Sequence, residues 1–191
     1  MNLSIVIPTY NRWVSLKNLL DQIYEQVYGN FEVIVINDCS NEYYNVKGYK
    51  NLVYIKNEVN LGNNKSFNIG FKMASKEIVL WLTDDVELYP NAIPNIVNYL
   101  RASDYQAVVF YIYGNGWEET RFQDGRFFVS VGATYKKIMD EVGYWNEDER
   151  FHGGDVDWSK RVWDAGYKIG RCDEARVKHL LLPHHFAVGQ K

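Results

Sequence analysis

The sequence contains few cysteines and no long hydrophobic run. Its two cysteines, Cys39 and Cys172, form no CxxC pair and lack the spacing of a metal site, as is typical of proteins from a reducing compartment. No stretch approaches the roughly 18–20 consecutive apolar residues of a membrane span. The N-terminal residues also lack a basic leader followed by an apolar segment. We therefore expect a cytoplasmic protein with neither a signal peptide nor a transmembrane segment.

Three widespread motifs of nucleotide-binding and hydrolytic proteins are also absent. The chain has no GxxxxGK[ST], which argues against a P-loop NTPase, and no GxGxxG, which argues against a dinucleotide-binding oxidoreductase. It has no GxSxG, which weakens an interpretation as an α/β-hydrolase. The net charge of −3 argues against a general nucleic-acid binder, so we expect no specific binding of nucleic acid.

Aromatic residues, in contrast, are abundant. They make up 16% of the 191 residues, with 15 Tyr and 6 Trp. Their flat apolar faces and polar edges suit contacts with sugars and bases. A Tyr-rich core and surface would explain the same composition equally well. The hydrophobic content of 47% is sufficient for one compact domain.

Short apolar runs alternate with helical spacing along the first part of the chain. We expect strands at 3–7, 31–36, 52–55, 77–82 and 107–113, and helices at 16–27, 64–74 and 90–100. This alternation predicts the α/β class, with a mostly parallel sheet flanked by helices. Further along we expect a loop at 114–125, a strand at 126–131, helices at 134–142 and 155–165, a loop at 143–154, and strands at 167–172 and 176–182.

Polar clusters directly follow three of the predicted strands, at 8–12, 37–41 and 83–87. Ligands of open α/β sheets bind outside the carboxyl ends of the strands, so these clusters mark the expected site. Asp84 and Asp85 are adjacent carboxylates that need a compensating charge. Magnesium and manganese take oxygen ligands and bridge phosphates well, so a metal site is one interpretation and a solvated acidic turn is the other.

Two further aspartates are candidates for function. Asp38 follows a buried strand, where it can accept hydrogen bonds from a ribose or a base, or cap the next turn. Asp155 follows Gly153 and Gly154 at a predicted helix start, where the helix dipole favours a carboxylate. A carboxylate beside a bound substrate can act as a general base, and an N-cap that only begins the helix is the equal alternative.

Three histidines near the end of the chain, His179, His184 and His185, could complete a metal shell. The sequence has neither HExxH nor zinc-site spacing, and a structural or exposed histidine is the commoner outcome for each of them.

Taken in order, five segments resemble glycosyltransferase family 2, whose members have the GT-A fold. They are SIVIPTYNR (4–12), FEVIVINDCSNE (31–42), NEVNLGNNKSFNIGFKMA (57–74), EIVLWLTDD (77–85) and GGDVDWSKRVWDAGYKI (153–169). The resemblance implies a GT-A-like, Rossmann-type, mostly parallel sheet flanked by helices in a single domain over residues 1–191. It implies that about residues 1–105 bind the nucleotide sugar and about residues 106–191 supply the acceptor site and the catalytic base.

The same resemblance implies roles for individual residues. A Mn²⁺ or Mg²⁺ ion on the donor diphosphate would be the cofactor. The implied donor-binding residues are Pro8, Thr9, Tyr10 and Arg12 around the base, Asp38 on the base, Gly62 and Asn68 in the 57–74 segment, and Asp84 on the ribose. The implied metal ligands are Asp85 and His179, and the implied general base is Asp155.

The chain departs from the family pattern at four positions. Asn37 and Thr83 stand where the family often has an acid, Cys39 where it often has Gly, and Gly154 where it usually has Glu. Asp157 is therefore a competing candidate for the base, although its spacing to Arg161 matches the family's following Asp.

The resemblance implies an inverting glycosyltransferase that moves a sugar from a nucleotide-sugar donor, by family frequency a UDP-sugar, to an acceptor hydroxyl. The acceptor would be a glycan, a lipid-linked molecule or another hydroxyl compound. A binding module that keeps the fold without turnover is the first alternative. A sugar nucleotidyltransferase is the second, but the N-terminus lacks the glycine-rich, basic signature that a triphosphate site needs.

Overall fold

The apolar runs of the first half of the chain form four parallel strands. The computed structural model describes residues 1–114, 116–148 and 153–180. In it, β3 (Leu52–Lys56), β2 (Asn30–Asn37), β1 (Asn2–Thr9) and β4 (Ile78–Trp81) lie side by side in that order. All four residues of β4 are buried, as expected for a parallel strand that is covered on both faces.

The second half of the chain extends the same sheet. The antiparallel strand β10 (Gly132–Tyr135) lies between β4 and β6 (Ala107–Gly114), and β11 (Ile169–His179) and β5 (Val86–Leu88) follow. Because β10 is antiparallel to both neighbours, β6 and β11 run in the same direction as the first four strands. These six strands therefore end at one edge of the sheet, which is where we expect the site. A short strand, β7 (Trp117–Glu118), pairs with the end of β6.

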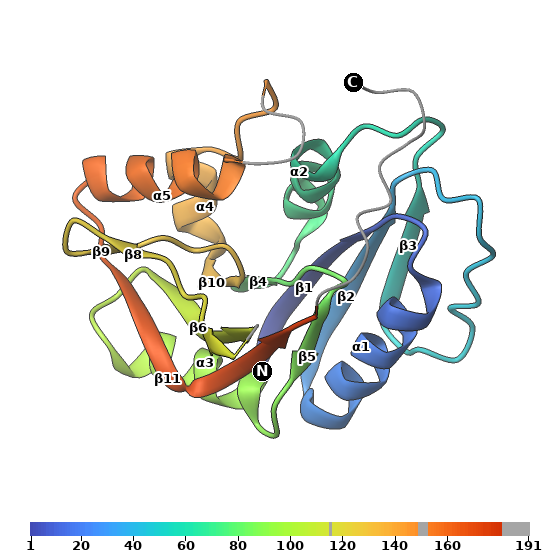
Figure 1. The fold of residues 1–191 in the computed structure, drawn as a ribbon, viewed down its shortest axis with the longest axis horizontal. Helices are drawn as coiled ribbons and strands as arrows, with labels where there is room; N and C mark the ends of the chain where they lie inside the picture. Colours follow the sequence, from blue (N-terminus) through green and yellow to red (C-terminus); the bar gives the residue numbers. More distant parts are fainter. Residues whose placement is uncertain (115, 149–152, 181–191) are drawn as a thin grey trace.

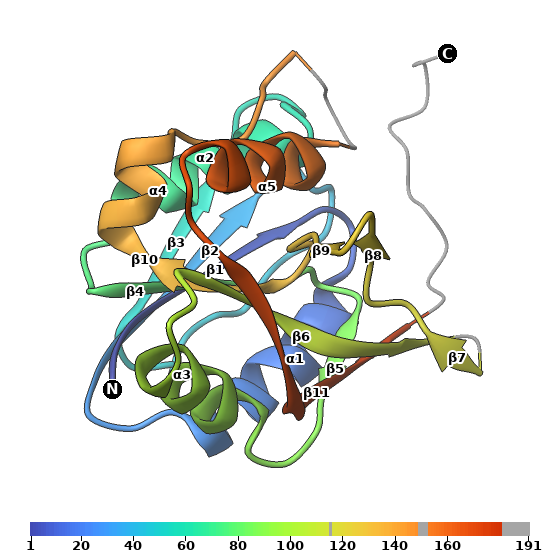
Figure 2. The ribbon, with the colours of Figure 1, turned by 90° about the vertical axis from the view of Figure 1, so that its left-hand side faces the viewer.

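Helices cover both faces of the sheet. Helices α1 (Trp13–Gln26) and α3 (Ala92–Ala102) lie on one face. Helices α2 (Asn63–Met73), α4 (Lys136–Val142) and α5 (Gly154–Asp164) lie on the other face (Figures 1 and 2). A two-stranded hairpin, β8 (Phe122–Gln123) and β9 (Arg126–Phe127), is on the same side as α5. The predicted class, a mostly parallel α/β sheet flanked by helices, is confirmed.

A cluster of buried aromatic rings joins β4 to the helices above it. Trp81 of β4 packs edge-to-face on Trp158 of α5, with ring centroids 5.6 Å apart, and on Phe71 of α2 at 5.8 Å. Trp145 lies 4.5 Å from Phe67 of α2 by the same measure. Trp158 is one helical turn beyond Asp155, so its packing on Trp81 fixes the start of α5 above the carboxyl end of β4.

Several predicted boundaries were wrong. Residues 134–135 belong to β10 rather than to a helix, and the strand predicted at 126–131 is reduced to β9. The three-residue β5 was missed, and α3 begins at Ala92 rather than at Pro90. The two strands predicted near the end are one strand, β11, with a register shift between Cys172 and Arg176. Among the described residues, no helix has the length and apolar character needed to cross a bilayer.

Candidate active site

The ends of β1, β4 and β11 meet at the carboxyl edge of the sheet. After β4, the chain passes through Thr83, Asp84 and Asp85 and turns back as β5, which pairs with β11 in a register that sets Val86 opposite His179. The backbone N–H of Leu180, the residue that follows β11, donates to the carbonyl oxygen of Asp85 at 2.7 Å. This pairing brings His179 beside an aspartate that lies 94 positions earlier in the sequence.

Asp84 is held by two donors from the segment that follows β1. Thr9 Oγ1 donates to Asp84 Oδ2 at 2.8 Å, and Arg12 Nη1 donates to Asp84 Oδ1 at 2.9 Å. The backbone carbonyl of Asp84 accepts a hydrogen bond from Ser15 Oγ. Burial raises the pKa of Asp84 to about 6, against the opposing effects of Arg12 and Thr9. The protein thus supplies polar partners for both carboxylate oxygens of Asp84.

Asp85 has one satisfied oxygen and one unsatisfied oxygen. Its Oδ2 accepts from Arg12 Nη1 at 2.9 Å and lies 3.7 Å from His179 Nε2, an ion-pair separation. Burial acts to raise the pKa of Asp85, but His179, Thr83 and Arg12 outweigh it and lower the pKa to about 2. Its Oδ1 is buried without a hydrogen-bond partner among the described residues. A buried, ionised oxygen without a donor matches the ligand that a hard divalent cation takes.

His179 lies between two carboxylates. Its Nε2 faces Asp85, and its Nδ1 is 2.7 Å from Oε2 of Glu119. The interaction with Asp85, aided by Glu119 and opposed by burial, raises the pKa of His179 to about 9. Within residues 1–114, 116–148 and 153–180, no group of three or more His, Cys, Asp or Glu side chains is arranged to hold a metal by itself. Asp85 and His179 could therefore hold an ion that also has ligands from a substrate.

Asp38 organises the segment between β3 and α2. Its Oδ1 accepts from the side chain of Asn57 at 2.9 Å and from the backbone N–H of Leu61 at 2.8 Å. Its Oδ2 accepts from the N–H of Gly62 at 2.9 Å, and Gly62 precedes α2 with a φ of +89°, which favours glycine. Asp38 and Gly62, two of the predicted donor-binding residues, are thus joined directly, and Asp38 is buried.

The other predicted donor residues have different positions. Pro8 and Thr9 are buried at the end of β1, and Tyr10 is half-buried just after it. Asn68, predicted from the resemblance to bind the donor, lies within α2 and forms hydrogen bonds with the loop before α5. Its Nδ2 donates to Trp145 O at 2.8 Å and to Glu147 Oε1 at 2.9 Å, and its Oδ1 accepts from Trp145 N at 3.0 Å.

A cavity of about 350 Å³ connects the end of β4 with the start of α5. Thr83 and Asp155 both line it, so the predicted base shares a cavity with the residue that precedes Asp84. The remaining lining residues are polar or aromatic side chains with one glycine and one valine: Asn63, Asn64, Phe67, Arg121, Ser130, Trp145, Gly153 and Val156. Such a lining, with apolar walls and a few polar groups, is typical of small-molecule sites.

Asp157 and Gly154 are engaged in local packing. Asp157 Oδ2 accepts from Arg161 Nε at 2.9 Å, one turn further along α5, and Asp157 does not line the cavity. A Cβ on Gly154 would lie 2.7 Å from Nδ2 of Asn64, so a larger residue here would displace that side chain. The helix thus directs Asp155 and Asp157 to different surroundings.

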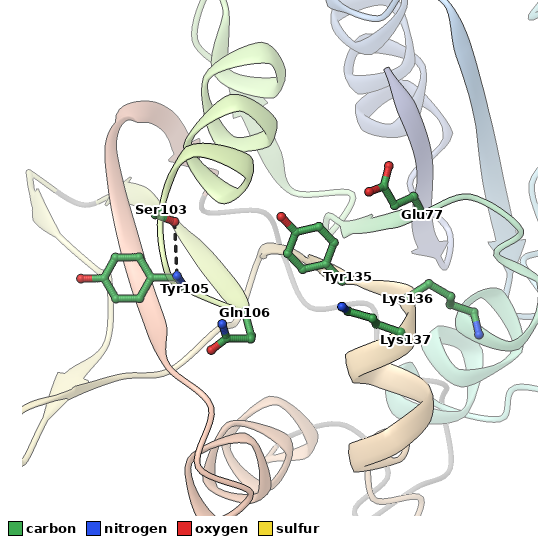
Figure 3. Close-up of a pocket in the computed structure, with 7 residues that line it drawn as sticks. All are labelled: Glu77, Ser103, Tyr105, Gln106, Tyr135, Lys136 and Lys137. Carbon is green, nitrogen blue, oxygen red and sulfur yellow. Dashed lines mark hydrogen bonds between the residues drawn. The ribbon is translucent and has the colours of Figure 1, made fainter.

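A second cavity, of about 480 Å³, lies at the opposite edge of the sheet (Figure 3). Its lining residues come from the turns that precede β4 and β6, from the end of β10 and from the start of α4: Glu77, Ser103, Tyr105, Gln106, Tyr135, Lys136 and Lys137. Glu77 is paired with Arg101, and Lys136 with Asp140. It is larger than the first cavity, but it lies away from the strand ends where α/β sheets bind ligands.

Sequence reasoning missed three side chains of the site. Glu119 and Arg121 come from the stretch predicted only as a loop, and Trp145 from the loop before α5. No spacing rule could have found Glu119, because its partner His179 is 60 positions away. The predicted candidates His184 and His185 lie outside the described residues.

A family model described as glycosyl transferase family 2 matches residues 4–162 of the chain. YwdF, an uncharacterized glycosyltransferase of Bacillus subtilis (strain 168), is 27% identical over 94% of this chain and 71% of its own length. The solved structure of S. aureus TarS 1-349 in complex with UDP superposes with a TM-score of 0.79 at 21% identity, over 96% of this chain. The complex of the same TarS fragment with UDP-GlcNAc gives a TM-score of 0.77 at 19% identity, over 100% of this chain.

The chain is short beside these proteins, since it spans 61% and 62% of the two TarS chains. The TarS likeness establishes a GT-A-like fold, and the family model covers most of the chain, including the strand that precedes Asp84 and Asp85 and the start of α5. The chain therefore belongs to glycosyl transferase family 2.

Proposed function

We propose that this chain transfers a sugar from a nucleotide-sugar donor to an acceptor hydroxyl, with inversion at the anomeric carbon. The observation that carries this proposal is the cavity shared by Thr83 and Asp155. A donor whose diphosphate lies at Asp85 would place its sugar in that cavity, within reach of a carboxylate from α5. Thr83, which directly precedes Asp84 and Asp85, and Asp155 both line this cavity, and a direct displacement needs two substrates bound side by side in this way.

Asp155 is the proposed general base. It accepts the proton of the acceptor hydroxyl while the acceptor oxygen forms its bond to the anomeric carbon and the bond from that carbon to the diphosphate oxygen breaks. Its place in the first turn of α5 supports this role, because the N-terminal end of a helix favours the carboxylate form. Asp157 is the weaker candidate because its carboxylate is paired with Arg161.

Asp85 and His179 are the proposed protein ligands of a divalent cation, Mn²⁺ or Mg²⁺. The unsatisfied Oδ1 of Asp85 supports this assignment. Such ions are commonly held by one or two protein groups together with substrate phosphates. When bound, the ion would neutralise charge on the departing nucleoside diphosphate. Arg12 already contacts Asp84 and Asp85, and it reduces the repulsion between the two carboxylates.

A UDP-sugar is the proposed donor. The support is the fold shared with TarS, whose structures contain UDP and UDP-GlcNAc. The proposed acceptor is a glycan, a lipid-linked molecule or another compound with a hydroxyl group, because the cavity lining combines the aromatic rings of Phe67 and Trp145 with amide and hydroxyl side chains.

A binding module without turnover is the alternative that one observation favours. Gly154 stands where the family usually has Glu, so the residue before Asp155 supplies no second carboxylate, and a Cβ at this position would displace the side chain of Asn64. An assay of donor turnover with a panel of nucleotide sugars and Mn²⁺ separates the two functions. Release of the nucleoside diphosphate from one of these donors supports the enzyme. Saturable donor binding with no release by water or any acceptor supports the binding module.

A further inference from the structure

Glu119 is held in place by the strand pairing at the end of β6. Strands β6 and β7 pair Tyr113 with Glu118, and the N–H of Glu119 then donates to Ile112 O at 2.8 Å. Oγ1 of the next residue, Thr120, accepts a hydrogen bond from the N–H of Ile112 at 2.8 Å. These hydrogen bonds fix the position of the Glu119 backbone, and therefore of its Cβ.

The carboxylate of Glu119 meets His179 across the neighbouring strand. Lys178 of β11 pairs with Tyr113 of β6, so the next residue of β11 lies beside the β6–β7 hairpin. Glu119 Oε2 is 2.7 Å from His179 Nδ1, and the Glu119 side chain is 20% exposed. The Nδ1 atom of the imidazole is therefore within hydrogen-bond distance of Glu119. Its Nε2 atom faces Asp85 and lies 3.7 Å from Oδ2 of that residue.

Gly114 leaves the space that this carboxylate occupies. A Cβ on Gly114 would lie 2.6 Å from Cδ and Oε1 of Glu119 and 2.7 Å from its Oε2. Real Cβ atoms do not approach other atoms this closely, so any other residue at position 114 would displace the Glu119 carboxylate. The β6–β7 pairing and the absence of a side chain at Gly114 thus both favour the same position of the Glu119 carboxylate.

We propose that Glu119 is a positioning residue that holds the His179 ring with Nδ1–H on Glu119 and Nε2 directed at Asp85. This proposal rests on the proposed function, in which Asp85 and His179 hold a divalent cation. A histidine that binds a metal through one nitrogen commonly donates from the other to a carboxylate, which fixes the tautomer and the ring orientation. Glu119 acts through His179 and needs no contact with the ion itself.

The first test is the affinity for Mn²⁺ in the presence of saturating UDP, measured by titration calorimetry. Loss of such an orienting partner typically weakens metal binding about 10–100-fold, which is the effect expected for Glu119→Ala. Glu119→Gln should retain most of the affinity, because its amide oxygen still accepts from Nδ1–H. Gly114→Ala should weaken binding in the same direction as Glu119→Ala. The matched control is Glu118→Ala, which removes the neighbouring carboxylate, paired with Arg171, and should leave the affinity unchanged.

The double variant distinguishes positioning from direct ligation. If Glu119 acts only through His179, Glu119→Ala combined with His179→Ala should bind Mn²⁺ no more weakly than His179→Ala alone. Additive losses would overturn the proposal, because they would mean that Glu119 acts on the ion independently of the histidine. Wild-type affinity in Glu119→Ala would overturn it as well.

A second measurement needs no metal, so it separates this proposal from the metal site. Long-range ¹H–¹⁵N spectra report the tautomer of a neutral imidazole, so they are recorded at a pH above the His179 pKa of about 9, and the His179→Ala spectrum assigns the signal among the four histidines. The expected result is an Nδ1–H tautomer in the wild type and a shift toward Nε2–H in Glu119→Ala. An identical tautomer in both proteins would overturn the proposal. Failure of the wild type to bind Mn²⁺, with the tautomer shift present, would refute the metal role alone.

Discussion

The proposed donor side and the proposed acceptor side of the site place their carboxylates in different surroundings. On the donor side, Asp38 accepts three hydrogen bonds and Asp84 accepts two, and both side chains are buried. On the acceptor side, Asp155 lines an open cavity, while Asp157 is paired with Arg161 at the surface of α5. Substitutions on the donor side should therefore change stability and binding together, whereas a substitution of Asp155 should change turnover alone.

The largest expected effect is on turnover by Asp155→Asn. Loss of general-base assistance typically lowers a rate about 10²–10⁴-fold. Donor affinity should remain close to that of the wild type, because Asp155 lies on α5 whereas the proposed metal ligand Asp85 follows β4. The matched control is Asp157→Asn on the same helix, which loses only a surface ion pair with Arg161 and should leave turnover close to the wild-type value. Steady-state rates at saturating donor and Mn²⁺ provide the comparison.

A contrary result would reassign the base. If Asp157→Asn is inactive while Asp155→Asn turns over normally, then the cavity geometry has identified the wrong carboxylate. If both variants lose donor affinity, α5 contributes to donor binding and the proposed separation of a donor side from an acceptor side is wrong.

A smaller effect, on stability, is expected for Arg12→Gln. The guanidinium contacts both Asp84 and Asp85, and the Arg12 side chain is 13% exposed. Removing one partner of a buried ion pair costs about 3–5 kcal/mol, and we expect roughly 3 kcal/mol in the free energy of unfolding. Saturating Mn²⁺ with UDP should restore part of this loss, since a ligand that binds only the folded state stabilises it. Urea denaturation with and without both ligands measures the two values.

The control for Arg12 is Lys17→Gln, which removes a paired cation from the exposed part of α1. This change should cost much less, because exposed ion pairs contribute little. An equal loss in the two variants would show that burial of the Arg12 contacts does not matter.

The smallest effect is expected for Asn68→Ala, which tests the hydrogen bonds between α2 and the loop before α5. The substitution removes three hydrogen bonds to Trp145 and Glu147 and leaves a buried backbone N–H without a partner. An unsatisfied buried group costs about 1–3 kcal/mol, so we expect a loss of about 2 kcal/mol in thermal or urea denaturation. Donor affinity should change little. The control is Lys72→Ala, which removes an exposed ion pair with Glu147 and a cation–π contact with Tyr144. A large loss of UDP affinity in Asn68→Ala would support the donor-binding role implied by the family resemblance.

The donor side could be predicted from sequence because its strands are continuous apolar runs. The parallel strands β1 and β4 are almost wholly buried and β2 is buried over its last five residues, and the polar residues that follow each strand must lie at the carboxyl edge. This rule placed Thr9, Arg12 and Asp84 in one region, and the structure joins them by hydrogen bonds.

The acceptor side could be predicted only in part. The strand β10 has four residues and one of them, Thr134, is a buried polar residue that donates to Gln106 O at 2.7 Å, so no hydrophobic pattern marks it. The contact between Glu119 and His179 depends on how β6, β7 and β11 pair, which spacing along the chain does not encode. Asp155 was placed correctly at a helix start because the two glycines before it are a local signal.

The most direct test of the proposed donor and metal site is the binding of UDP, measured calorimetrically with and without Mn²⁺. We predict that Mn²⁺ strengthens UDP binding by the wild type and that Asp85→Asn removes most of this enhancement. Asp84→Asn should retain more of it, because Asp84 is bonded to Thr9 and Arg12 and only Asp85 has an unsatisfied oxygen. Equal losses in the two variants, or UDP binding that does not respond to Mn²⁺, would contradict the assignment of Asp85 as the metal ligand of a donor site.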